Sequence, residues 1–134
     1  MNEFIINKKL PSLNDIIRWN RAGAYVGARH KKEIDELIGH SIRKAVKSGT
    51  LHKPKGAVII SIEWTEADKR RDADNIIAGG TKFICDALVD NKVLIDDNRR
   101  FVKGFYHKIV DGKEYKIKVE LIDIKERVWN IITN

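Results

Sequence analysis

The sequence predicts an α/β (α+β) fold, a small mixed β-sheet with helices packed on one side of it. Segments in which apolar and polar residues alternate, as in half-buried strands, occur near both ends and in the middle of the chain. Between them, apolar residues recur every three or four positions, which is typical of helices. No repeat, low-complexity stretch or linker interrupts the 134 residues. We therefore expect one domain over residues 1–134, with the element order β-α-β-α-β-β.

The first half of the chain predicts a strand, a helix and a second strand. Residues 3–7 are typical of a short strand, and residues 57–64 place apolar side chains on one side of a longer one. Residues 10–29 lack a sustained period and contain turn-forming residues, so we expect a loop with room for one helical turn. Residues 30–47 show one apolar helical face, and Gly49 follows where a helix end favours glycine.

The second half predicts one further helix and a pair of strands. Residues 82–90 place apolar side chains on one helical face, while Gly79-Gly80 interrupts any helix that starts at Asn75. The two pieces are therefore expected to be separate or kinked. Residues 101–109 and 115–124 alternate and flank an Asp-Gly pair, which predicts a β-hairpin. The terminal segment is apolar enough to pack in the core or in a dimer interface through Trp129, Ile131 and Ile132.

The composition favours a polyanionic partner and a reducing compartment. The formal net charge is +7, from 26 lysines and arginines against 19 acidic residues. The single cysteine, Cys85, excludes an intrachain disulfide and a cysteine-based zinc cluster. The longest apolar run near the N-terminus is short, so neither a signal peptide nor a membrane span is expected.

The cations gather in clusters that we place at element edges or in loops. Such loop cations can converge on one face and contact the backbone of a nucleic acid. The clusters are Lys8-Lys9, Arg29-His30-Lys31-Lys32, Lys69-Arg70-Arg71 and Arg99-Arg100.

Carboxylates follow one of these clusters on alternate residues. Asp72 and Asp74 point the same way if the segment is extended, and Mg²⁺ takes hard oxygen ligands of this kind. Asp96-Asp97 could supply a further carboxylate. Taken alone, the pattern favours a purely structural role, in which Asp72 and Asp74 form surface ion pairs with the preceding cations and bind no metal. The spacing excludes a calcium-binding EF-hand loop, and no phosphate-binding loop of the P-loop type is present.

A longer sequence pattern favours the metal site over the surface ion pairs. "RRDADN" followed by "KFICDALVDNKVLIDD", over residues 70–97, resembles the RusA family of Holliday junction resolvases of bacteria and their phages. "LPSLN" at 10–14 matches the family's N-terminal segment more weakly. The resemblance implies a cytoplasmic, bacterial or phage-encoded homodimer that cuts four-way DNA junctions symmetrically in recombination and repair. It also implies dependence on Mg²⁺, with Mn²⁺ as a possible substitute.

The resemblance also assigns roles to residues. It implies that Asp72, Asp74 and Asp97 bind the metal, that Lys82 is the essential lysine, and that Arg71 matches the basic residue before the first aspartate. In the best-known member the lysine follows the Asp-Asn pair more closely. Without an insertion in this chain, Ala78 would occupy the lysine position.

Two other functions remain open from the sequence. The chain could be a basic, non-catalytic DNA-binding module, or a metal-dependent nuclease acting on flaps or other branched DNA. In each case the cations would contact phosphates without reading sequence. The residues expected to do so are Lys8, Lys9, Arg29, Lys31, Lys32, Lys69, Arg70, Arg71, Arg99 and Arg100.

Overall fold

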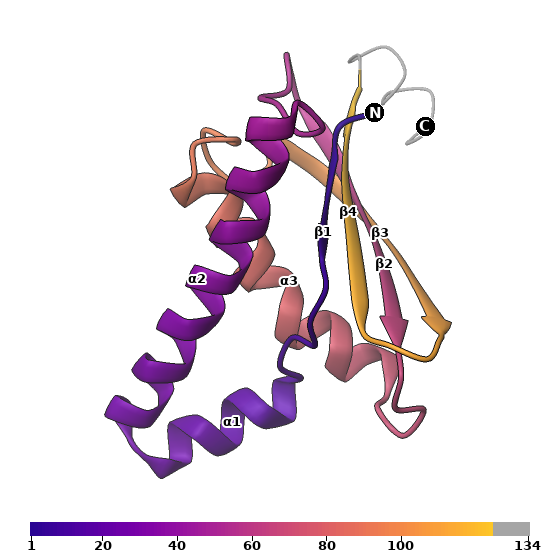
Figure 1. The fold of residues 1–134 in the computed structure, drawn as a ribbon. Coiled ribbons are helices and arrows are strands. Elements are labelled where there is room, and N and C mark those ends of the chain that lie inside the picture. Colours follow the sequence, from indigo (N-terminus) through magenta and orange to yellow (C-terminus); the bar gives the residue numbers. More distant parts are fainter. Residues whose placement is uncertain (125–134) are drawn as a thin grey trace.

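A computed structural model describes residues 1–124 and contains four strands and three helices (Figure 1). In chain order they are β1 (Glu3–Ile6), α1 (Leu13–Ala22), α2 (Ala24–Ser48), β2 (Val58–Glu66), α3 (Ala73–Asp90), β3 (Val102–Asp111) and β4 (Lys116–Asp123). The predicted α+β class with a small mixed sheet is confirmed. The expected packing of Trp129, Ile131 and Ile132 lies outside the described residues.

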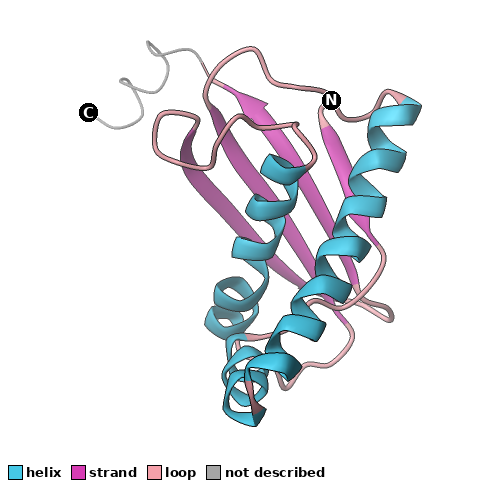
Figure 2. Cartoon of the chain, turned by 90° about the vertical axis from the view of Figure 1, so that its left-hand side faces the viewer, coloured by secondary structure: helices cyan, strands magenta, loops and turns pink. Residues whose placement is uncertain are grey.

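The helices cover one face of the sheet (Figure 2). The strand order is β1-β4-β2-β3, with β2 parallel to β3 and antiparallel to β4. Strand β2 directs Val58, Ile60, Ile62 and Trp64 into the core, where Ile38 and Ile42 of α2 and Ile84 and Leu88 of α3 are also buried. Among residues 1–124, no helix is both long enough and apolar enough to cross a membrane.

The predicted hairpin between the last two strands is wrong, although both strands exist. Strand β2 lies between β3 and β4 and pairs with each, so residues 112–115 pass over its end. There the Gly112 N–H donates to the carbonyl of Glu66 at 3.0 Å. Strand β2 is buried or half-buried at nearly every position, because β3 and β4 cover its two edges and the helices cover one of its faces. A strand, a helix and a strand in sequence, here β2-α3-β3, is the usual route to a parallel pair.

The segment expected to be a loop, residues 10–29, contains α1 and the start of α2. Ser12 caps α1: its hydroxyl accepts from the Asp15 N–H at 3.2 Å, while the Asp15 carboxylate accepts from the Ser12 N–H at 3.0 Å. Ser12 and Asp15, three positions apart, are the sequence signal of this capping box and explain why a helix forms here in place of the expected loop. Gly23, at φ 132°, separates the two helices, whereas Gly27 lies within α2.

The remaining helix boundaries agree better with the sequence. Helix α2 includes the predicted segment 30–47 and ends at Gly49, which adopts the left-handed conformation at φ 83°. Its buried residues Ile38, Ile42 and Ala45 belong to the apolar face that the sequence predicts.

Helix α3 runs without a break through Gly79-Gly80, so the expected interruption does not occur. These glycines permit a close approach of the segment Leu10–Ser12, the "LPS" of the sequence. A Cβ on Gly79 would lie 2.3 Å from the Pro11 carbonyl oxygen, and one on Gly80 would lie 2.7 Å from the Trp64 ring. The helix-breaking tendency of glycine is outweighed because no larger residue fits there.

We predict that Gly79→Ala destabilises the protein by at least about 2 kcal/mol, because the new methyl group meets backbone atoms that cannot move independently. Gly56→Ala is the control, since a Cβ there meets no atom within 4 Å. Urea unfolding followed by circular dichroism measures both free energies. Equal stability of the two variants would contradict the packing described here.

Candidate functional site

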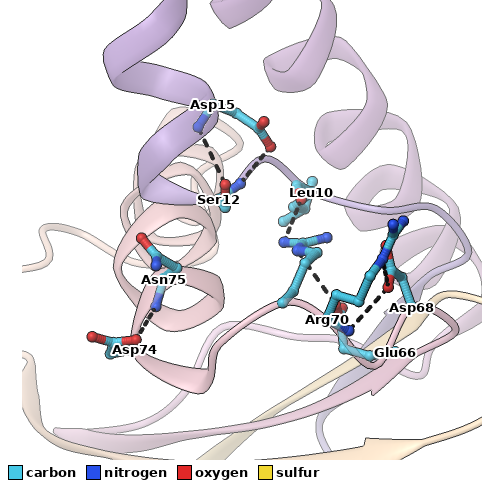
Figure 3. Close-up of polar contacts among 9 residues, drawn as sticks. Leu10, Ser12, Asp15, Glu66, Asp68, Arg70, Asp74 and Asn75 are labelled. Atoms are coloured by element: carbon cyan, nitrogen blue, oxygen red, sulfur yellow. Dashed lines mark hydrogen bonds and ion pairs between the residues drawn. The ribbon is translucent and has the colours of Figure 1, made fainter.

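Asp72 and Asp74 lie at the N-terminus of α3 and are exposed to solvent. Asp72 occupies the N-cap position, yet its carboxylate forms no capping hydrogen bond. Asp74 lies in the first turn, where its carboxylate accepts from the neighbouring Asn75 N–H, at 2.9 Å (Figure 3). The partial positive charge of the helix N-terminus favours carboxylates at both positions. The Asp72 carboxylate is therefore not used to cap the helix.

Two of the three cations that precede these carboxylates, Arg70 and Arg71, pair with other acids. Arg70 forms two side-chain hydrogen bonds with Asp68, both 2.9 Å long. Among residues 1–124, neither Asp72 nor Asp74 forms an ion pair. The interpretation in which Asp72 and Asp74 neutralise the preceding cations therefore does not describe this loop.

The side chain of Arg71 is largely enclosed by the fold. Its Nη2 donates to the Leu10 carbonyl at 3.0 Å, and its Nε lies 3.4 Å from Glu66 Oε1. The two side chains are only 11% and 7% exposed, respectively. Dashed lines to Leu10 and Glu66 in Figure 3 mark these contacts. In this structure the Arg71 side chain is thus not presented to a DNA backbone, contrary to the expectation from the sequence.

Glu66 is a buried acid that the sequence reasoning missed. Burial raises the pKa of its carboxyl group, while the charges of Arg71 and Lys9 oppose that rise. The signal was present, because Glu66 continues the alternation of the buried residues Ile62 and Trp64 on β2. Its Oε1 and the Arg71 Nε and Nη1 have no hydrogen-bond partner within residues 1–124. The pair is therefore held by charge in a low-dielectric setting and depends on both members being present.

Lys82 and Asp97 form a second charged group farther along α3. The Lys82 ammonium lies 3.0 Å from Asp97 Oδ2 and 3.0 Å from Asp86 Oδ1. The hydrogen bonds that the Lys82 ammonium donates to Asp86 and Asp97 raise the pKa of Lys82, and the bond from Lys82 lowers the pKa of Asp97. The lysine is therefore charged at every ordinary pH. Asp96 accepts from the Asp97 N–H at 2.7 Å and from Asn98 Nδ2 at 3.1 Å, so its carboxylate is engaged in local hydrogen bonds with the next two residues.

Cys85 is buried one helical turn from Lys82. Desolvation, with a smaller effect from the Asp97 charge, raises the pKa of its thiol to about 12. A thiol in this environment is a poor nucleophile and a poor metal ligand, so Cys85 packs the core.

The structure does not bring the expected carboxylates together. Eight residues separate Asp74 from Lys82, which corresponds to about 12 Å along the helix axis. Because Lys82 contacts Asp86, one turn nearer the C-terminus, its ammonium is directed away from Asp74. Among the described residues, no three His, Cys, Asp or Glu side chains are close enough to share a metal ion. Ala78 is exposed and lies one turn after Asp74, at the position that the lysine would take without the insertion.

The expected DNA-binding cations fall into three regions. Lys69 and the paired Arg70 are exposed in the loop before α3, and Lys8 and Lys9 are exposed after β1, where Lys9 is close enough to favour ionised Glu66. Arg29, Lys31 and Lys32 are exposed on α2 rather than in a loop, and Lys31 pairs with Asp35 at 2.6 Å. Arg99 and Arg100 are exposed in the connection that leads into β3.

Comparison with known proteins adds no assignment, since no protein-family model matches the chain and a search of curated proteins finds no relative. The site is therefore interpreted from its own geometry.

We predict that Arg71→Ala lowers the free energy of unfolding by about 3 kcal/mol, because it leaves the buried Glu66 charge without its partner. The adjacent Arg70→Ala is the control, and its exposed pair with Asp68 should contribute almost nothing to stability. Chemical unfolding measures both.

A double-mutant cycle identifies the cause. Glu66→Gln should reduce the cost of replacing Arg71 with Met, because the buried negative charge is then absent. Additive effects would show that Arg71 stabilises the fold through packing and its bond to Leu10 alone.

Proposed function

We propose that this protein is a Mg²⁺-dependent endonuclease that cuts branched DNA, with four-way junctions as the preferred substrate. The observation that carries the proposal is the Asp72–Asp74 pair: two exposed carboxylates without an ion-pair partner among residues 1–124, in a chain with net charge +7. Two carboxylates that remain unpaired in a protein rich in lysine and arginine are available to bind a metal cation. The resemblance of residues 70–97 to RusA resolvases supports the same assignment.

The residues present fit Mg²⁺ in the manner usual for nucleotide-processing sites. Such an ion is commonly held by one or two carboxylates, and waters and substrate phosphates complete its coordination. Asp72 and Asp74 can supply these ligands. Asp97 would join them only after leaving Lys82, because it lies near the middle of α3 rather than at its start. When bound, Mg²⁺ would supply Lewis-acid activation of water and neutralise charge on the phosphoryl oxygens.

The protein's own residues would hold and orient the DNA strand. Lys69 precedes Asp72 by three residues and Lys9 lies near Asp68 of the same loop, so these exposed lysines, with Lys8 beside Lys9 in the chain, would contact phosphates next to the cleaved bond. Lys82 remains positively charged at any pH suitable for cleavage, but in the free protein its ammonium is paired with both Asp86 and Asp97. A phosphate that displaces Asp97 would receive a cation that is already fixed in place.

One observation favours the alternative of a non-catalytic DNA-binding module, namely that the described residues contain no three-ligand cluster. A flap-directed nuclease is a third candidate with the same site. Cleavage assays with Mg²⁺ or with EDTA on four-way, flap, duplex and single-stranded DNA separate the three. Products only from the four-way substrate support the resolvase proposal, products mainly from flaps support the third candidate, and no product supports the module.

We predict that Asp72→Asn and Asp74→Asn each reduce Mg²⁺-dependent cleavage at least about 100-fold while junction binding in EDTA is retained, because only the metal ligands are changed. Asp68→Asn is the matched control, since Asp68 lies in the same loop but is already paired with Arg70. Single-turnover cleavage and gel-shift assays measure the two properties.

Two results would contradict the metal-site proposal. One is loss of junction binding with unchanged cleavage per bound complex. The other is an unchanged heat of Mg²⁺ binding in the Asp72→Asn/Asp74→Asn double variant by calorimetry.

We propose further that the active form is a homodimer. Two symmetric cuts need two sites, whereas the chain offers one Asp-x-Asp pair and no internal repeat. Light scattering under cleavage conditions should give about twice the chain mass of 15.4 kDa. A monomer that remains fully active would contradict the proposal. The resemblance also leads us to propose a cytoplasmic location in a bacterium or a phage-infected cell.

A further inference from the structure

A second cationic region lies away from Asp72 and Asp74, where α3 ends and β2 and β3 begin (Figure 1). A cavity of about 620 Å³ opens there between residues 53–57 and the connection 91–101. This volume lies within the range of about 300–1,000 Å³ that is typical of small-ligand sites. The cavity therefore has room for a group the size of a nucleotide.

The lining of this cavity combines apolar walls with a basic rim. Its charged lining residues are all cations: Lys53, Lys55, Lys92 and Arg100. Val93 and Leu94 form part of the apolar wall, Phe101 adds an aromatic ring, and Ile95 is 80% exposed at the edge. The nearby Asp123 carboxylate accepts from the Lys55 and Gly56 N–H groups, at 3.1 and 3.2 Å, so it faces the backbone.

Lys92 lies on the cavity rim directly after the C-cap of α3, where a left-handed backbone conformation commonly ends a helix. Among residues 1–124, Lys92 is the one residue other than glycine with a positive φ, at 62°. This left-handed conformation is unfavourable for a side chain such as lysine, and glycine or asparagine normally occupies it. The chain thus keeps a lysine on the cavity rim where another residue would be more stable.

We propose that this cavity binds an unpaired nucleotide of a nucleic-acid strand. The apolar walls and the Phe101 ring would receive the base, and Lys53, Lys55, Lys92 and Arg100 would contact its flanking phosphates. Single-strand sites commonly combine a basic groove with an aromatic or apolar platform in this way. Because every charged side chain of the lining is positive, charge complementarity requires an anionic ligand.

The inference rests on the proposed function for its substrate class and extends it. Asp97 and Arg100 lie in the same connection, 91–101, so the cavity is a few residues away in sequence from a candidate catalytic group. Strands that leave a duplex at a branch carry unpaired or unstacked bases. A protein that selects branched DNA can therefore gain selectivity by binding one such base outside the cleavage site.

The test measures binding without catalysis. The probe is a single-stranded thymidine oligonucleotide with one 2-aminopurine, and a perfect duplex of the same length serves for comparison, both in EDTA. We expect the 2-aminopurine fluorescence to change on binding, and we expect Ile95→Glu to weaken single-strand binding at least about tenfold with little effect on the duplex. Ile95 is exposed, so this variant should fold normally.

Lys92→Gly supplies a second readout. It should weaken single-strand binding at least about fivefold while the thermal unfolding midpoint stays equal or rises, since glycine adopts a positive φ without strain. Lys113→Ala removes a charge from the connection after β3 and should change binding less than about twofold.

Three outcomes would overturn the inference: a 2-aminopurine signal that is unaffected by Ile95→Glu, an equal loss of binding in Lys113→Ala, or competition by poly-glutamate as effective as that by the oligonucleotide. The last result would indicate an acidic peptide as the ligand. A protein that passes these tests but never cleaves DNA would refute only the proposed nuclease activity. Cleavage that depends on Asp72 alongside a failed binding test would refute only the nucleotide site.

Discussion

The close contact between the segment Leu10–Ser12 and helix α3 is the constraint on which the rest of the site depends. Gly79 permits the Pro11 backbone to lie against the helix, and Gly80 makes room for Trp64. From the other side, Arg71 donates to the Leu10 carbonyl. The segment is thus fixed between the first turns of α3 and the residue that precedes them. The start of α1 at Ser12 and the orientation of Asp72 and Asp74 follow from this arrangement.

This packing also decides which charges are available. In a run of three cations and two carboxylates, mutual neutralisation is the simplest expectation, and the sequence alone favours it. The fold instead buries Arg71 beside Glu66 and pairs Arg70 with Asp68. Both partners precede the cations in the chain, so the carboxylates that follow are left to solvent. Glu66, buried two positions after Trp64 on β2, therefore determines which charges of the exposed loop remain unpaired.

The sequence predicted the fold class and most elements because amphipathic periods are local properties. It failed where long-range packing outweighs local preference. Gly79-Gly80 signals a break in a peptide, yet here it allows close contact with Pro11 that only the folded chain provides. The Asp-Gly pair at 111–112 is typical of a hairpin, but the apolar strand β2 takes the place between β3 and β4. The missed α1 had a local signal in Ser12 and Asp15, so that error was avoidable. The sequence identifies Asp72, Asp74 and Lys82 as candidate site residues. It does not predict that Arg71 is enclosed, because this depends on long-range contacts with Leu10 and Glu66.

The separation of the two charged groups on α3 limits how they can act. Asp74 and Lys82 are about 12 Å apart along the axis, which corresponds to about three or four phosphate steps of a duplex strand. As the chain is folded here, the two groups can reach different phosphates of one strand but not the same phosphate. A single centre that contains Asp72, Asp74, Asp97 and Lys82 requires the connection 91–101 to shift along the helix and the Lys82 side chain to turn toward Asp74. That same connection lines the basic cavity through Lys92, Ile95 and Arg100. A strand bound in the cavity would therefore contact the segment that carries Asp97, so binding there would be coupled to the position of this carboxylate.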